Sequence, residues 1–322
     1  MNNKKLCVVG AGNWGKNHIK TLNQLNCLEG IVDKDDIQLN HFKEKYPNIK
    51  VYNRVDDALN DNYDGYVVAT NAHSHFEISK FLIENNQHVL VEKPITLNSD
   101  DATILHNLAN SKNVNLMVGH VLLFHPAFQK IKSLIDDGTL GKLQYMYSNR
   151  LNLGTIRTEE NVFWSFAPHD IALYQYFTNS FPQKITSRGS DVLQDGVHDT
   201  TITTIEYPNN VMGHIFVSWL HPFKEHRFVV VGSQGMIRFE DSMEGKPLVF
   251  YDKNINWEEG KPIPHSGSTR HIEYNDKMPL TAELQYFIDH LNGIPLTINN
   301  SESAIEVIKI LELATNSLME NK

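Results

Sequence analysis

The stretch that most constrains the fold of this chain is Lys5 to Lys20, KLCVVGAGNWGKNHIK. A short apolar run breaks into glycines at Gly10, Gly12 and Gly15, and helical spacing of apolar residues resumes after them. This order predicts a strand, a tight turn and a helix. In such a unit the first glycine makes the turn, the second lets the backbone approach a pyrophosphate, and the third lets the helix pack on the strand.

A second apolar run supports this interpretation because it ends in Asp33, twenty-one residues after Gly12. An acidic side chain at that place is expected to accept hydrogen bonds from the ribose hydroxyls of a dinucleotide. Its charge should repel a 2′-phosphate, so the sequence predicts NAD rather than NADP as the cofactor. The adjacent Lys34 weakens this preference, because a cation can accommodate the extra phosphate.

The alternation of helices and strands continues through the first part of the chain. The pattern predicts strands at 51–52, 65–69, 88–91 and 114–118, and helices at 37–46, 55–59, 76–84 and 99–112. This rhythm predicts a Rossmann domain, a doubly wound parallel sheet, over residues 1–120, with its ligand at the carboxyl ends of the strands. Gly10, Asp33, Thr70, Asn71 and Lys93 all fall at such ends.

The second part of the chain has a different pattern. Short turns between strand-like runs predict an α+β domain over residues 121–322, with a largely antiparallel open sheet. The expected strands are 143–148, 200–207, 211–219, 227–231, 236–240 and 248–251, and the expected helices are 126–135, 169–177, 279–292 and 301–319. The last three helices should cover one side of the sheet. The polar segment 258–274 is expected to be a surface loop or a flap near a site.

Composition excludes several classes of protein. A chain of 322 residues suits two domains, and its net charge of −9 argues against general nucleic-acid binding. The apolar runs are too short for a membrane-spanning helix, and no signal-peptide pattern precedes the first strand. The two cysteines, Cys7 and Cys27, suit a reducing compartment, so a cytoplasmic protein without a membrane or nucleic-acid partner is expected. No H-x-x-x-H or C-x-x-C spacing occurs, so no metal site is predicted.

Two residues are candidates for acid/base chemistry, since oxidising an alcohol by hydride transfer requires a group that takes the hydroxyl proton. Lys93 ends a strand on the cofactor edge, before Pro94, which stiffens the turn and leaves a cis peptide bond open as an alternative. His169 follows Pro168 near a helix start, where the dipole favours a neutral imidazole. The alternatives are a solvated surface lysine and a histidine that caps or packs.

The glycine-rich turn, the Glu92-Lys93-Pro94 triplet and the histidine on a helix of the second domain together resemble the glucose-fructose oxidoreductase/inositol dehydrogenase (Gfo/Idh/MocA) family. The resemblance spans nearly the whole chain, and the run 149–170 is similar to the branch that acts on nucleotide-linked sugars. That branch oxidises UDP-N-acetylhexosamines or their uronic acids at C3, before an aminotransferase and an acetyltransferase act, for cell-surface polysaccharide or lipid A sugars. By matching position, Lys93 and His169 would share acid/base duty.

This sequence departs from the family pattern in two places. Ser165 stands where many relatives have an aspartate four residues before the histidine, so a three-residue proton relay is not expected. Histidines, His120 and His125, follow the sixth strand where many relatives have an arginine.

These arguments together define a candidate site. The expected cofactor-binding residues are Gly10, Gly12, Asn13, Trp14, Gly15, Asp33, Thr70, Asn71, His75, Glu92 and Lys93. The expected substrate-binding residues are His120, Arg150, Asn152, Arg157, Asn161, Trp164 and His169. Arginine forks suit a diphosphate, an aromatic face suits uracil or a sugar, and asparagines suit hydroxyl or acetamido groups. Each has a structural alternative, a rim salt bridge for an arginine or a core position for a tryptophan.

The leading hypothesis is NAD-dependent oxidation of a nucleotide sugar, UDP-N-acetylglucosamine or a derivative such as its uronic acid, to the 3-keto sugar. Reduction of a 3-keto nucleotide deoxysugar and an inositol or free-sugar dehydrogenase are the enzymatic alternatives. A dinucleotide-sensing regulator is the alternative from a different class. Lys93 and His169 argue against it, because a sensor needs no acid/base pair. By resemblance, the domain over residues 121–322 serves substrate binding and oligomerisation, and its open sheet implies a homodimer or homotetramer.

Overall fold

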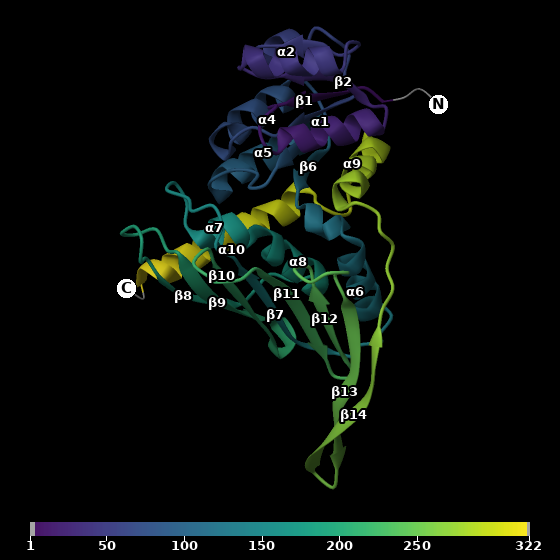
Figure 1. Cartoon of the computed structure of the whole chain (residues 1–322), viewed down its shortest axis with the longest axis vertical. Helices are drawn as coiled ribbons and strands as arrows, with labels where there is room; N and C mark the ends of the chain where they lie inside the picture. Colours follow the sequence, from purple (N-terminus) through teal and green to yellow (C-terminus); the bar gives the residue numbers. More distant parts are fainter. Residues whose placement is uncertain (1–3, 321–322) are drawn as a thin grey trace. The chain divides into compact units, whose positions relative to one another are not determined.

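The computed structural model describes residues 4–320 and divides into two compact units (Figure 1). Unit 1 runs to Phe124 and also includes Lys277–Ile308, whereas unit 2 consists of His125–Asp276 and the chain from Lys309 onward. The sequence predicted one boundary near residue 120 between two continuous domains. The structure differs from that prediction, because a segment near the C-terminus returns to the first unit.

Unit 1 is built on a parallel sheet of six strands in the order β3-β2-β1-β4-β5-β6. Its strands are β1 (Leu6–Val9), β2 (Leu28–Val32), β3 (Lys50–Tyr52), β4 (Gly65–Val68), β5 (Val89–Glu92) and β6 (Leu116–Gly119). Its helices are α1 (Gly15–Gln24), α2 (Asp36–Lys45), α3 (Val55–Ala58), η1 (Ala72–Ser74), α4 (His75–Glu84), α5 (Ser99–Lys112), η2 (Val121–Phe124) and α9 (Pro279–His290). Strands β1, β4, β5 and β6 are buried along their whole length, as strands covered on both faces should be. The predicted Rossmann domain is confirmed.

The helix α9 belongs to unit 1 and not, as predicted, to the cover of the second sheet. The side-chain amide of Asn115 donates to the carbonyl oxygens of His290 and Ile294 at 2.9 and 2.8 Å, which joins the end of α9 to the start of β6. The backbone N–H of Val118 donates to Asn299 O at 2.9 Å. An amphipathic pattern shows that a helix has an apolar face but does not show which sheet that face meets.

Unit 2 is built on an eight-stranded sheet in the order β14-β13-β12-β11-β7-β10-β9-β8. Its strands are β7 (Leu143–Leu151), β8 (Lys184–Ser190), β9 (Thr200–Tyr207), β10 (Val211–Ser218), β11 (Glu225–Gly232), β12 (Met236–Glu240), β13 (Leu248–Glu258) and β14 (Lys261–His271). Its helices are α6 (Pro126–Asp136), α7 (Val162–Phe166), α8 (Pro168–Thr178), η3 (Pro208–Asn210) and the second part of α10 (Ser301–Glu320). All neighbouring strands are antiparallel except β7 and β10, so the predicted largely antiparallel sheet is confirmed.

The helices of unit 2 cover one face of this sheet. The ring of Phe128 on α6 lies 5.3 Å from that of Phe228 on β11, and a side chain at Gly213 would collide with the ring of Tyr174 on α8. The sequence did not indicate β8 or α7. One outer edge of the sheet is β8, which exposes Lys184 and Arg188, and the other is β14.

The far ends of β13 and β14 extend past the neighbouring strands as a two-stranded ribbon (Figure 1). The prediction of a loop or flap over 258–274 is wrong, because most of this segment is β14. All of β14 is exposed, so it lacks the alternation of apolar and polar residues by which a strand is recognised. Pro262 and Pro264 lie in β14, and since proline has no N–H, their nitrogens suit the outward side of an edge strand.

No helix within residues 4–320 is both long enough and apolar enough to cross a lipid bilayer.

Candidate active site

The glycine-rich turn joins β1 to α1 as the sequence predicts, and each glycine has a distinct geometry. Gly10 has a φ of +98°, which a side chain rarely adopts, so it makes the turn. A Cβ on Gly15 would lie 1.9 Å from the carbonyl oxygen of Gly10, so only glycine lets α1 start this close to the strand. A Cβ on Gly12 would meet no atom within 4 Å. The backbone at Gly12 therefore faces open space, as a pyrophosphate-binding turn requires.

That open space is part of a cavity of about 830 Å³ in unit 1. Seven predicted cofactor-binding residues line it: Gly10, Gly12, Asn13, Trp14, Asp33, Thr70 and Asn71. They come from the ends of β1, β2 and β4 and from the start of α1, where N–H groups and the helix dipole favour phosphate. The glycine turn, the volume and the acidic residue at the end of β2 therefore fit a dinucleotide.

The carboxylate of Asp33 is held in place at the end of β2. Its Oδ2 accepts the N–H of Ala11 at 2.6 Å, and its Oδ1 accepts the N–H of Asp35 at 2.9 Å. These bonds fix the carboxylate against the glycine-rich turn while leaving other lone pairs for a ligand.

The same end of the cavity has cationic and amide side chains, some of which the sequence argument missed. Lys34, Asn53 and Arg54 line the cavity beside Asp33. The guanidinium of Arg54 pairs with the exposed Asp56 at 2.7 Å, and both charges are largely solvated. Asn53 and Arg54 follow β3, and the strand-end argument that selected Thr70 also applies to them.

Glu92 and Lys93 end β5 on this edge, and the Lys93–Pro94 peptide bond is cis. Glu92 is buried, and its Oε1 accepts hydrogen bonds from the indole N–H of Trp14 and from His18 Nε2, the latter at 2.7 Å. Glu92 therefore lies behind the cavity wall instead of lining it. The side chain of Lys93 is half-buried.

His75, predicted to bind the cofactor, is buried and does not line the cavity. Its Nδ1 lies 2.8 Å from the carbonyl oxygen of Pro94 and its Nε2 lies 3.2 Å from that of Thr70. Burial lowers the pKa of His75, although these two carbonyl contacts and Glu92 oppose the shift. The geometry gives it a different task, because it holds the turn after Lys93 against the end of β4.

His120, predicted to bind substrate, follows β6 in unit 1 and is buried. Burial and the positive charge of Lys93 lower its pKa to about 4, although Glu92 opposes the shift. His120 is therefore a neutral imidazole at physiological pH, close enough to Lys93 to feel its charge.

In unit 2, α8 brings two predicted residues together. His169 is half-buried in the first turn of α8, and the next residue, Asp170, is buried. Arg150 on β7 donates from its Nε to Asp170 Oδ2 at 2.5 Å. Burial raises the pKa of Asp170, and the charge and hydrogen bond of Arg150 oppose that rise. Arg150 is therefore anchored beside the helix start that carries His169.

The other predicted substrate residues have local partners. Asn161 caps α7, since its Oδ1 accepts the N–H groups of Phe163 and Trp164 at 3.0 and 3.1 Å. The indole N–H of Trp164 donates to Thr315 Oγ1 at 2.9 Å. Arg157 is exposed, with its Nε 3.9 Å from Glu160. Asn152 is half-buried just after β7, and its backbone N–H donates to Ser218 O at 3.0 Å.

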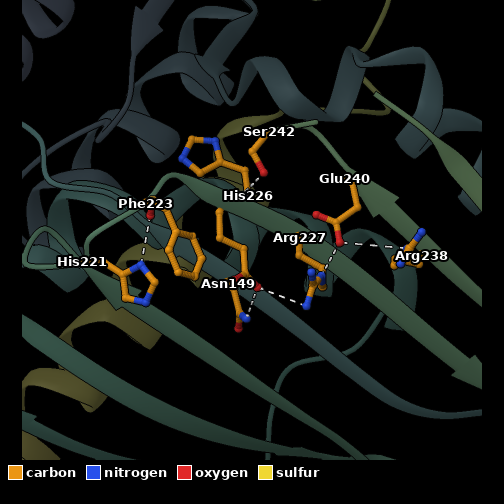
Figure 2. A network of polar contacts seen from close by, with 9 residues as sticks. Asn149, His221, Phe223, His226, Arg227, Arg238, Glu240 and Ser242 are labelled. Atoms are coloured by element: carbon orange, nitrogen blue, oxygen red, sulfur yellow. Dashed lines mark hydrogen bonds and ion pairs between the residues drawn. The ribbon is translucent and has the colours of Figure 1, made fainter. Parts of the chain in front are cut away.

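A polar network joins side chains of β7, β11 and β12 (Figure 2). Arg227 on β11 bonds to Glu240 on β12, and its Nη1 lies 3.3 Å from Glu225. The side-chain amide of Asn149, the residue before Arg150, also donates to Glu225 at 2.7 Å. Successive residues of a strand point to opposite faces, so the side chains of Asn149 and Arg227 lie on the face opposite Arg150. His226, also drawn in Figure 2, is the register partner of Arg150, and its charge acts on Asp170.

The candidate residues thus form two groups, one in each unit. The cofactor group and Lys93 lie in unit 1, and Arg150 and His169 lie in unit 2. That Lys93 and His169 act on one substrate stays a prediction. Among residues 4–320, no three His, Cys, Asp or Glu side chains are grouped so that they could hold a metal ion.

Comparison with known proteins places the chain among oxidoreductases. A model of the oxidoreductase family with an NAD-binding Rossmann fold matches residues 4–120, and a model of the GFO/IDH/MocA C-terminal domain matches residues 128–238. A myo-inositol 2-dehydrogenase of Thermotoga maritima is 25% identical over 263 residues, 77% of this chain and 78% of that protein. A UDP-N-acetylglucosamine 3-dehydrogenase of Acidithiobacillus ferrooxidans is 24% identical over 194 residues, 58% of each.

Solved structures share the fold over the whole chain. The UDP-N-acetylglucosamine 3-dehydrogenase GnnA of A. ferrooxidans superposes with a TM-score of 0.87 at 18% identity, covering 99% of both chains. The WlbA dehydrogenase of Bordetella pertussis, in complex with NADH and UDP-GlcNAcA, superposes with a TM-score of 0.80 at 17% identity, covering 100% of this chain and 98% of that one. Because the models of the NAD-binding domain and of the C-terminal domain both match, the chain belongs to the GFO/IDH/MocA family of NAD-binding oxidoreductases.

Proposed function

We propose that this protein is an NAD-dependent dehydrogenase that oxidises C3 of a nucleotide sugar, UDP-N-acetylglucosamine or its uronic acid. The observation that carries the proposal is that one sheet edge holds both a cavity suited to a dinucleotide and the strand end that bears Lys93. Relatives with the same fold support the substrate class, since one is named for UDP-N-acetylglucosamine and another was solved with UDP-GlcNAcA.

When bound in this cavity, NAD would supply the hydride acceptor for C3 of the sugar. Lys93, in its neutral amine form, would take the hydroxyl proton in concert with His169, whose place at a helix start favours a neutral ring that can accept it. Arg150, held by Asp170, is oriented to bind the diphosphate of the substrate. His120 is neutral, so it adds no positive charge that would compete with Lys93 for the substrate.

The cofactor preference follows from the charge of Asp33, which disfavours a 2′-phosphate. NAD is therefore the proposed cofactor. Lys34 and Arg54 lie beside it, so residual use of NADP is expected. A product of this kind, a 3-keto nucleotide sugar, suits consumption by an aminotransferase and then an acetyltransferase.

The test is a panel of substrates mixed with NAD, with reduced nicotinamide followed by absorbance. UDP-N-acetylglucosamine or its uronic acid should give turnover, a product two hydrogens lighter, and a slower rate when C3 carries deuterium.

Lys93→Met should lower kcat by about 10²-fold or more while NAD affinity stays nearly unchanged. Turnover of myo-inositol alone would favour the second candidate, which the longer alignment with an inositol dehydrogenase supports. Absence of turnover with every substrate, in both directions, would refute the enzyme.

We also propose that two copies associate through the face of the eight-stranded sheet that the helices of unit 2 leave open. Strand register places six apolar or aromatic side chains side by side on this face: Tyr145, Tyr147, His214, Phe216, Val229 and Val231. The rings of Tyr147 and His214 stack with their centroids 5.1 Å apart. Asn149 and Arg227, drawn in Figure 2, lie on the same face two residues beyond Tyr147 and Val229. Large apolar patches of this kind mark interaction surfaces.

Light scattering on the purified chain tests this association. The wild-type protein should be a dimer or a tetramer, and Val229→Glu should shift it toward a smaller species. Ile37→Glu, on the exposed face of α2, is the matched control and should leave the mass unchanged. A monomeric wild-type protein would refute the proposal.

A further inference from the structure

A buried polar cluster in unit 1 lies behind the turn that carries Lys93. Its centre is Glu92, which is 7% exposed although it ends a strand beside the cavity. One carboxylate oxygen accepts from His18 Nε2 at 2.7 Å and from the indole N–H of Trp14, and the other accepts the backbone N–H of Lys93 at 3.2 Å. A single side chain therefore joins the start of α1 to the backbone of Lys93.

The geometry around Glu92 leaves it little freedom. Trp14 and His18 are four residues apart, so they project from the same side of α1. Gly119 on β6 is the register partner of Glu92, and a Cβ there would lie 3.0 Å from its carboxyl carbon. The carboxylate is thus confined between α1 and the backbone of β6, and its direction depends on its donors.

The charge of Glu92 depends on the same donors. Burial by itself raises the pKa of a carboxyl group, but the hydrogen bonds of His18 and Trp14 and the charges of His18 and Lys93 outweigh burial, so the pKa of Glu92 is lowered. A buried carboxylate without such partners would be very unfavourable. Removal of His18 should therefore either displace the carboxylate or protonate it.

We propose that His18 is a positioning residue for Lys93 and acts through Glu92. His18 is fully buried and does not line the cavity, so it cannot touch a bound dinucleotide there. It fixes the carboxylate that holds the Lys93 N–H, and a misplacement of about 1 Å in a reacting group can cost about 10²-fold in rate. Trp14 contacts the same carboxylate and also lines the cavity. The catalytic part of this inference rests on the function proposed above.

The first test measures hydrogen exchange in the full chain without any substrate. Exchange at the Lys93 N–H is followed residue by residue by NMR, because Pro94 has no N–H and the first two residues of a proteolytic fragment lose their label. His18→Phe keeps a ring but removes the donor, and exchange at Lys93 should become about tenfold faster or more. His18→Gln keeps an N–H donor and should restore slow exchange. His41→Phe, an exposed histidine on α2, is the matched control and should leave exchange unchanged.

The second test uses turnover. His18→Phe should lower kcat by about tenfold or more, with NAD affinity measured calorimetrically within about threefold of the wild type, and His18→Gln should recover most of kcat. The acidic limb of kcat/KM should move to higher pH in His18→Phe, because burial then dominates the protonation of Glu92. The titratable or charged groups that interact with Glu92 are His18, Lys93, His75, His120 and Glu283.

The two tests separate this inference from the proposed function. If no substrate turns over but exchange at Lys93 responds to His18→Phe, the positioning is supported and the proposed reaction is refuted. If exchange at Lys93 is unchanged in His18→Phe, the inference is overturned, whatever the enzyme does. Should His18→Phe fail to fold, Trp14→Phe removes the other side-chain donor at an exposed position and should speed exchange at Lys93 as well. Unchanged exchange in that variant would likewise overturn the inference.

Discussion

At the scale of single residues, we propose that the side chain of Asp33 selects NAD over NADP. Both of its oxygens accept backbone N–H groups, so its orientation is fixed by the turn. Asp33→Asn removes the negative charge but can keep one acceptor, and the ratio of kcat/KM for NAD to that for NADP should fall by about tenfold or more. Asp100→Asn, an exposed residue of α5, is the control and should leave the ratio unchanged. A constant ratio in Asp33→Asn would mean that the carboxylate does not select NAD.

Glu283 on α9 is a second residue whose charge matters, because it is fully buried in unit 1. Burial and the negative charge of Glu92 raise the pKa of Glu283 well above the usual value for glutamate. The folded state therefore holds a proton that the unfolded state releases above about pH 4.3. The contribution of Glu283 to the free energy of unfolding is therefore at its highest below that pH. It falls by about 1.4 kcal/mol per pH unit as the pH rises from there toward the folded-state pKa.

Glu283→Gln should remove this loss, since a neutral amide can replace the neutral acid. The melting temperature of the variant should exceed that of the wild type by a margin that grows as the pH rises above 5 toward the folded-state pKa of Glu283. Glu29→Gln, an exposed glutamate of β2, provides the control and should follow the wild type at each pH. A margin that stays constant with pH would show that Glu283 is ionised in the folded protein.

At the scale of elements, we expect two glycines of the glycine-rich turn to have different roles, Gly15 in the stability of the fold and Gly12 in NAD binding. Gly15→Ala would place a Cβ 1.9 Å from Gly10 O, so it should destabilise the protein by roughly 1–3 kcal/mol. Gly12→Ala meets no atom within 4 Å and should leave the melting temperature unchanged, but it should weaken NAD binding by about tenfold or more. Calorimetry of NAD binding and thermal melting distinguish the two effects. Equal loss of stability in both variants would contradict these separate roles.

The sequence predicted elements well where the pattern had one clear period. The apolar runs of β1 and β4 and the helical spacing of α5 are visible because each buries a continuous face or both faces. The ribbon formed by β13 and β14 was missed because both faces of its outer part meet water, so no alternation marks it. A strand that is exposed on both faces need not show the alternation of apolar and polar residues.

The sequence could group residues of the candidate site only where strand ends bring them together. Gly12, Asp33 and Asn71 line one cavity because the ends of parallel strands share one edge, and their binding of a cofactor stays a prediction. His75 does not line that cavity, and sequence spacing could not show that its ring turns to backbone carbonyls. His18 drew no attention, since a buried histidine on an apolar helix face looks like a packing residue until Glu92 is placed beside it.

At the scale of the whole molecule, the division into two units leads to a prediction about fragments of unit 1. Unit 1 needs Lys277–Ile308, because the ring of Phe124 lies 5.2 Å from that of Tyr286 and the buried Glu283 and Asn299 come from that segment. Residues 1–124 alone should therefore melt less cooperatively than residues 1–124 joined by a short flexible linker to 277–308. Circular dichroism and NAD calorimetry check this. Equal stability of the two fragments would mean that the returning segment adds little to unit 1.

The two edge strands of the eight-stranded sheet, β8 and β14, affect how the protein can self-associate. The β8 edge exposes charged side chains, and Pro262 and Pro264 remove two main-chain N–H donors from β14. Neither edge is a good template for a strand from another molecule, so the open face is the surface through which we propose that two copies associate. Self-association of this protein should accordingly stop at small, closed complexes and should not grow into fibrils.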